Sequence, residues 1–97
     1  MATYIGLLNW TDQGIAGFRD SAERADAFGQ ILQGAGGSLQ SVWWCLGPYD
    51  IVAVMEAPDD EAITAAMLQV GALGNIRSAT LRAFGREEFQ GIIASIG

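Results

Sequence analysis

Two segments of this chain carry apolar side chains on both faces of an extended strand. Thr3 to Trp10 places Ile5 and Leu7 on one face and larger apolar side chains on the other, and Tyr49 to Glu56 contains the run IVAVM. A strand that is apolar on both faces is covered on both faces. Both segments are therefore predicted to lie in the centre of a sheet.

The remaining elements follow from capping residues, glycines and apolar periodicity. The stretch TDQGIAGFR is predicted as a glycine-punctuated connection. A first helix begins after Asp20, with Glu23 in the capping-box position, and ends at Gly36-Gly37. The other predicted elements are a strand Leu39–Leu46, a turn at Gly47-Pro48, a helix from Pro58 and Asp59 to Gly74-Asn75, a strand Ile76–Phe84 and a helix Arg86–Ile96.

The predicted order is β-α-β-β-α-β followed by a helix, in one domain spanning residues 1–97. This is the ferredoxin-like arrangement of the α+β class, and its sheet order 4-1-3-2 puts the two doubly apolar strands in the middle. The helices of this fold cover one face of the sheet, so the other face stays apolar and unpaired. Two such faces packed together would form a dimeric α/β barrel.

Composition favours self-association and excludes several classes of partner. Apolar residues make up 51% of the 97 residues and charged ones only 16%, which is little charge for the surface of a small monomer. A net charge of −6 with no lysine argues against nucleic-acid binding. The N-terminus lacks the basic region of a signal, and no apolar run reaches membrane-spanning length. A single cysteine, Cys45, fits a reducing compartment, so a cytoplasmic homo-oligomer is expected.

The residue inventory leaves little catalytic chemistry. The chain has no histidine and no lysine, which removes the commonest general base, the commonest metal ligand and Schiff-base chemistry. Cys45 has no histidine partner and is interpreted as a packing residue. No metal and no cofactor are expected, and an enzyme is the less favoured class.

Residues around one hairpin are the candidates for a binding site. Trp43 and Trp44 are adjacent in a strand, so they point to opposite faces, one toward the helices and one toward a partner sheet or cavity. Asp50 lies at the start of an apolar strand, where an unpaired carboxylate is costly. It either accepts backbone N–H bonds near the turn, pairs with an arginine, or serves as a polar anchor in a pocket. Arg77 and Arg82 lie on opposite faces of the last predicted strand. One of them could hold a ligand carboxylate, with surface solvation or an ion pair across the dimer as the preferred alternative.

Three stretches give the chain a resemblance to a known family. YIGLLNWTDQGI, GPYDIVAVMEAPDDE and LGNIRSATLRAFGREEF resemble the GYD-domain proteins, small bacterial and archaeal proteins named for a Gly-x-Tyr-Asp element. The element here is Gly47, Pro48, Tyr49 and Asp50. The resemblance implies the ferredoxin-like, dimeric α/β-barrel fold and no established activity. A looser similarity to the ligand-binding domain of Lrp/AsnC regulators implies binding of amino-acid-like molecules between subunits.

Three functions remain open from the sequence. The preferred hypothesis is a self-associating module that binds a small molecule at or near the subunit interface. The alternatives are an enzyme similar to the cofactor-free monooxygenases and a purely structural assembly protein. The predicted ligand-binding residues are Trp10, Trp43, Trp44, Tyr49, Asp50 and Arg77.

Overall fold

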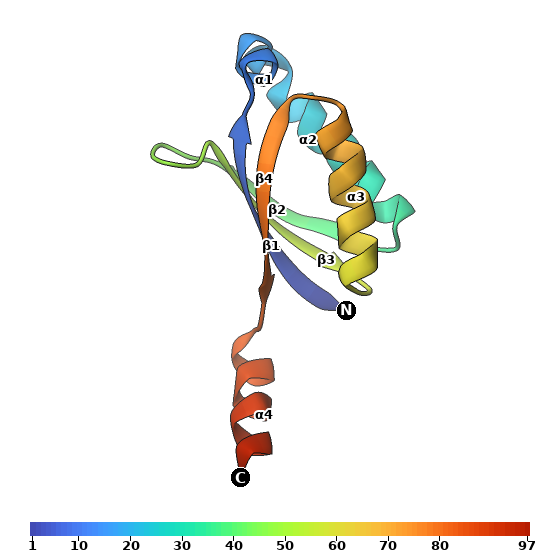
Figure 1. The fold of residues 1–97 in the computed structure, drawn as a ribbon, viewed down its shortest axis with the longest axis vertical. Coiled ribbons are helices and arrows are strands. Elements are labelled where there is room, and N and C mark those ends of the chain that lie inside the picture. The colour runs from blue at the N-terminus through green and yellow to red at the C-terminus, as the bar shows by residue number, and fades with distance from the viewer.

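The structure is a four-stranded antiparallel sheet with two long helices on one face (Figure 1). It is a computed structural model that describes all 97 residues. The elements are β1 (Ala2–Trp10), α1 (Asp12–Ala16), a 3₁₀ turn η1 (Phe18–Asp20), α2 (Ser21–Gly34), β2 (Ser38–Trp44), β3 (Ile51–Ala57), α3 (Asp60–Ala72), β4 (Ile76–Ala83) and α4 (Arg86–Ile96). No helix of the chain is both long and apolar enough to cross a bilayer.

The sheet order β2-β3-β1-β4 confirms the predicted ferredoxin-like topology, since it is 4-1-3-2 in reverse. β1 and β3 are the central strands, as their apolar patterns require, and β2 and β4 are the edges. Buried and half-buried residues alternate along β1 and β3, so every second side chain enters the core beneath α2 and α3.

The core is small and lies on the helix side of the sheet. Fourteen residues are buried, and Leu32 and Met55 are the largest side chains fully enclosed there. Tyr4 and Leu8 of β1 and Phe28 of α2 belong to the same cluster. This core buries only the side of the sheet that faces the helices, and the opposite face is free for other contacts.

The face of the sheet away from the helices is called the open face here. The strand registers place two apolar rows across it: Trp43, Val52, Leu7 and Ala79, and beside them Val54, Ile5 and Leu81 with the polar Ser41. These side chains are half-buried or exposed, with Trp43 64% and Leu81 48% exposed. No element of the chain covers the open face (Figure 1).

α4 begins and ends at the predicted residues, but its apolar side chains pack on nothing in their own chain. It continues from β4 away from the sheet and accounts for much of the 52 Å long axis (Figure 1). Its apolar stripe of Phe89, Ile92, Ile93 and Ile96 is exposed throughout. The single chain therefore offers no groove for this stripe.

The segment between β1 and α2 differs from prediction in two ways. The connection after β1 contains the short helix α1. Thr11 is its N-cap, because the Thr11 hydroxyl accepts the Gly14 N–H at 3.1 Å. Asp20 does occupy the cap position of α2, but its side chain makes no capping hydrogen bond.

The hairpin between β2 and β3 also differs from prediction. Both strands are shorter at the turn than predicted, since β2 ends at Trp44 and β3 starts at Ile51. The Cys45 N–H donates to the Asp50 carbonyl at 2.7 Å and closes the loop. Gly47 has a φ of +128°, a conformation that only glycine adopts without strain, so the ladder cannot continue through this position.

Candidate functional site

The two adjacent tryptophans separate to opposite faces, as their spacing predicts. Trp44 lies opposite Ile51 on the helix side, and its indole N–H donates to the Ser21 hydroxyl at 2.9 Å. Trp43 lies opposite Val52 on the open face. One indole is therefore tied to the first turn of α2, while the other is presented to whatever meets the open face.

An apolar cavity of about 80 Å³ lies between α2, the sheet and the end of α3. Trp10 and Trp44 are both in its wall, with Phe28, Ile31 and Val42. The polar groups at this cavity are few, and Arg24 among them donates to the carbonyls of Gly14 and Gly17 at 3.0 Å each. The cavity therefore suits a small apolar group better than a charged one.

The cavity brings together only two of the six predicted site residues. Trp43 and Arg77 lie on the open face, where Arg77 is opposite Asn9. Tyr49 is half-buried at the end of the hairpin loop beside Asp50, and neither lines the cavity. The predicted set thus divides between two faces of the sheet and the hairpin between them.

Asp50 holds the hairpin against the central strand. Its carboxylate accepts the backbone N–H of Trp10 at 3.0 Å, and its own N–H donates to the Leu8 carbonyl at 2.9 Å. The backbone donor foreseen for this carboxylate is therefore present, but it belongs to β1 and not to the Gly47-Pro48 turn. Asp50 extends the β1–β3 pairing beyond the regular ladder.

Removing the Asp50 carboxylate is expected to destabilise the protein. Asp50→Ala leaves the Trp10 N–H without its acceptor, which should lower the free energy of unfolding by about 1–3 kcal/mol. Asp50→Asn keeps an acceptor oxygen and should cost less. Thermal and denaturant unfolding of the three proteins measures both effects, and full stability in Asp50→Ala would contradict this structural role.

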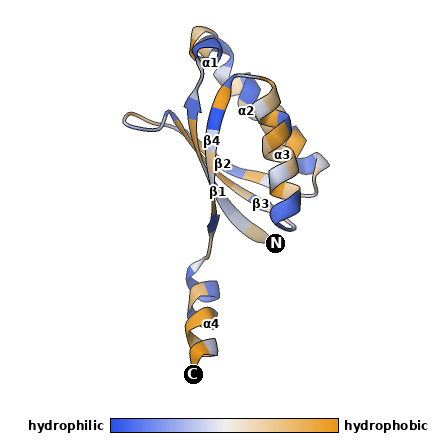
Figure 2. Cartoon of the chain, in the orientation of Figure 1, coloured by the Kyte–Doolittle hydropathy of each residue, from blue (hydrophilic) through white to orange (hydrophobic).

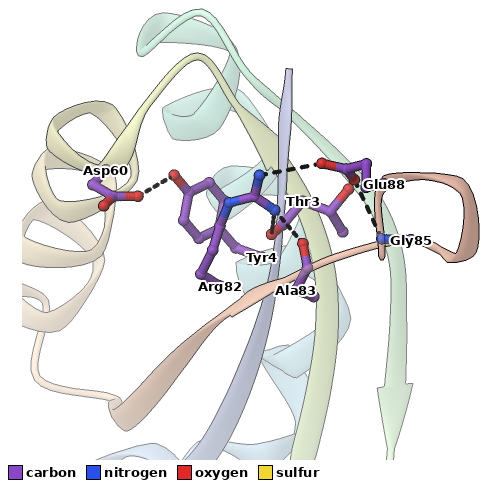
Figure 3. A network of polar contacts seen from close by, with 7 residues as sticks. All are labelled: Thr3, Tyr4, Asp60, Arg82, Ala83, Gly85 and Glu88. Carbon is purple, nitrogen blue, oxygen red and sulfur yellow. Dashed lines mark hydrogen bonds and ion pairs between the residues drawn. The ribbon is translucent and has the colours of Figure 1, made fainter. Parts of the chain in front are cut away.

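A polar network that the sequence did not indicate lies on the helix side of the sheet, near the start of β1 (Figure 3). The Tyr4 hydroxyl donates to Asp60 Oδ1 at 2.6 Å, joining β1 to the first turn of α3. The Arg82 guanidinium lies over the Tyr4 ring and 4.4 Å from the centroid of the Phe84 ring. It donates to the carbonyls of Thr3 and Ala83 and pairs with Glu88 at 3.3 Å.

The charges of this network shift two pKa values. The hydrogen bond to Asp60, with burial and the charge of that carboxylate, raises the pKa of Tyr4 to about 12. The Gly85 N–H, followed by Arg82, lowers the pKa of Glu88. The Glu88 carboxylate also caps α4, because its Oε1 accepts the Gly85 N–H at 3.2 Å. The network therefore fixes the point where α4 leaves the sheet.

The Tyr4–Asp60 bond predicts a specific alkaline titration. Since the pKa of Tyr4 is higher in the folded protein than its ordinary value of 10.0, the bond stabilises the fold below pH 10 and is lost between pH 10 and about 12. Ultraviolet titration should show one tyrosinate forming near pH 12, and Tyr4→Phe should remove that step. If Tyr4→Phe still shows this step, the step belongs to a different group and the prediction is wrong.

The structure brings no three cysteine, aspartate or glutamate side chains together at one point. The sheet edge and α3 enclose a groove of about 480 Å³ that contains Tyr4, Asp60 and Arg82. No sequence pattern pointed to this groove, because its residues come from β1, α3 and β4 and meet only through the fold.

The chain is similar to known proteins over most of its length. The family model of the GYD domain matches residues 4–93. A protein of Thermus thermophilus described as a glutamine synthetase and cystathionine beta-lyase binding protein is 34% identical over 84 residues, which are 86% of this chain and 88% of that protein.

Two solved structures share the fold. A crystal structure of a protein from Thermus thermophilus has a TM-score of 0.56 and 25% identity, covering 88% of this chain and 95% of the other. A hypothetical protein from Pyrococcus horikoshii has a TM-score of 0.57 at 12% identity, covering 89% and 93% of the two chains. The second similarity is one of fold alone.

Proposed function

Because the chain belongs to the GYD domain family, we propose that it works as a self-associating module that binds other molecules. The observation that carries the proposal is the pair of unpartnered apolar surfaces, the open face and the stripe of α4. Figure 2 shows α4 standing apart from the sheet, with hydrophilic residues at its start and hydrophobic ones toward its C-terminal end. An exposed patch of this kind marks an interaction surface.

The exposed area of the chain supports an interface of ordinary size. A folded monomer of this mass is expected to expose about 5,400 Å². This chain exposes 6244 Å². The excess is close to the roughly 800 Å² that each partner buries in a standard protein interface. A second copy of the chain offers the same two surfaces, so pairing would cover both at once.

Two kinds of bound molecule fit this module. The relative from Thermus thermophilus is described as binding two enzymes, which favours protein partners for this chain as well. The apolar cavity beside Trp10 and Trp44 fits a small apolar group. In the assembled protein, Trp43 and Arg77 would lie at the subunit interface, since both are on the open face.

Native mass spectrometry of freshly purified protein tests both parts of the proposal. We expect a mass of at least twice that of the 10.3 kDa chain. A small molecule that is retained by the wild type should be lost in Ala27→Leu, because Ala27 lines the cavity. Ala22→Leu, on the same helix outside that lining, is the matched control. A monomeric mass would contradict self-association, and equal retention by both variants would contradict the cavity as the binding site.

A further inference from the structure

β4 is an edge strand that nothing in the chain protects. It pairs with β1 on one side only, in an uninterrupted register from Ile76 to Ala83. All residues from Arg77 to Arg82 are exposed in the single chain, both on the open face and on the side that α3 lines. The other edge strand, β2, is interrupted by an irregularity between Leu39 and Ser41. A long regular edge is a ready template for another strand.

The groove of about 480 Å³ lies directly beside this edge, between β4 and α3. Its floor is formed by Tyr4, which is 3% exposed, and by the small side chains of Ser78 and Thr80. The wall contributed by α3 contains Met67 and Leu68, and Leu68 is 69% exposed. The groove therefore combines an apolar wall with a hydroxyl-lined strand.

The charge of the groove favours a basic occupant. Asp60 lies at one end, and the Tyr4 hydroxyl occupies only one of its two carboxylate oxygens. Asp59 and Glu61 flank it in sequence, and the whole chain carries a net charge of −6. The one cation of the groove, Arg82, is already paired with Glu88.

These observations point to one mode of recognition. We propose that β4 and α3 form a docking site for an extended peptide segment of a partner protein, which adds to β4 as a fifth strand. Main-chain hydrogen bonds would join the peptide to the free edge, and every second side chain would point to the groove side. The segment would alternate, with apolar side chains beside Met67 and Leu68 and a lysine or arginine near Asp60.

A second copy of the chain fits this site poorly. Its β4 would bring Ser78, Thr80 and Arg82 to the groove side. Ser78 and Thr80 are too small to fill the groove. Arg82 is already paired with Glu88. It would also bring a second Asp60 and a second net charge of −6. The inference rests on the proposed role of binding protein partners, and it does not depend on self-association through the open face.

A synthetic probe tests the strand addition directly. The peptide acetyl-Lys-Thr-Val-Thr-Leu-Thr-amide presents Lys, Val and Leu to one side. Amide NMR shifts on its titration should concentrate in β4 and in the first turn of α3. Two further peptides distinguish main-chain pairing from side-chain contact alone. One is N-methylated on the odd-numbered residues and the other on the even-numbered residues, so that only one of them loses the N–H groups that face β4. One frame should weaken binding about tenfold, as loss of hydrogen bonds requires, and the other should change it little.

Variants of the protein provide a second test of the proposed docking site. Thr80→Phe fills the groove and should abolish peptide binding without altering the assembled mass, whereas Ala79→Phe, on the open face of the same strand, should leave peptide binding intact. A peptide with glutamate in place of the lysine should bind more weakly than the lysine peptide. In Asp60→Asn, the difference in affinity between the two peptides should be smaller.

The results separate this inference from the proposed function. Peptide binding by a protein that is monomeric would leave the inference standing and remove self-association. An assembled protein with no shifts in β4, or with equal effects of both methylation frames, would overturn the inference alone. A fall in assembled mass on adding the peptide would also overturn it, because β4 would then be the contact between copies.

Discussion

Leu81→Asp is expected to convert the assembled protein into monomers of 10.3 kDa. Leu81 lies in the apolar row with Ile5 and Val54 on the open face, and it is 48% exposed in the single chain. A carboxylate there would be buried without a partner on association. The cost should be about 3 kcal/mol, or roughly a hundredfold in the dissociation constant. Light scattering or sedimentation at micromolar concentration measures the change.

Ser78→Asp is the matched control for this variant. Ser78 is on the same strand and the substitution adds the same charge, but it lies on the helix side of the sheet, opposite Leu8. The mass of this variant should equal that of the wild type. If Ser78→Asp dissociates the protein and Leu81→Asp does not, then the open face is not the interface.

Removing α4, residues 86–97, is expected to lower both the melting temperature and the assembled mass. A helix of 11 residues is marginal in water on its own, and the apolar stripe of this one is not covered by its own chain. Its four large apolar side chains would contribute about 1.5–3 kcal/mol each when fully buried, as an upper limit. Since those contacts would lie in another subunit, the loss should depend on protein concentration.

A substitution within the helix sharpens this test. Ile93→Asp breaks the stripe and should reproduce the truncation, whereas Gln90→Asp, outside the stripe, should not. Unchanged melting and mass in the truncated protein would show that α4 contributes nothing to assembly, and the account of its apolar stripe would then be wrong.

The sequence allowed the sheet to be predicted because its signals are local. The doubly apolar runs in β1 and β3 identify central strands, and strand alternation alone separates Trp43 from Trp44. The bounds of α4 were also right, because its stripe has the regular spacing of a helix. Alternation further places Trp10 on the same face as Leu8, which is why it lines the cavity with Trp44.

What could not be predicted depends on contacts between distant residues. The Tyr4–Asp60 bond joins positions 56 residues apart, and an acid in the first turn of a helix such as Asp60 is ordinarily explained by the helix dipole alone. The groove beside β4 exists because Ser78 and Thr80 are small where the fold brings α3 alongside, and no local pattern encodes that. α1 was missed because glycines obscured its cap, although Thr11 followed by Gly14 carried the signal.

Sedimentation equilibrium of the wild-type protein at micromolar concentration tests the central claim most directly. We predict a mass of at least twice 10.3 kDa, because a second copy would cover the open face and the stripe of α4. A single species of 10.3 kDa across the concentration range would contradict self-association and the barrel assembly with it.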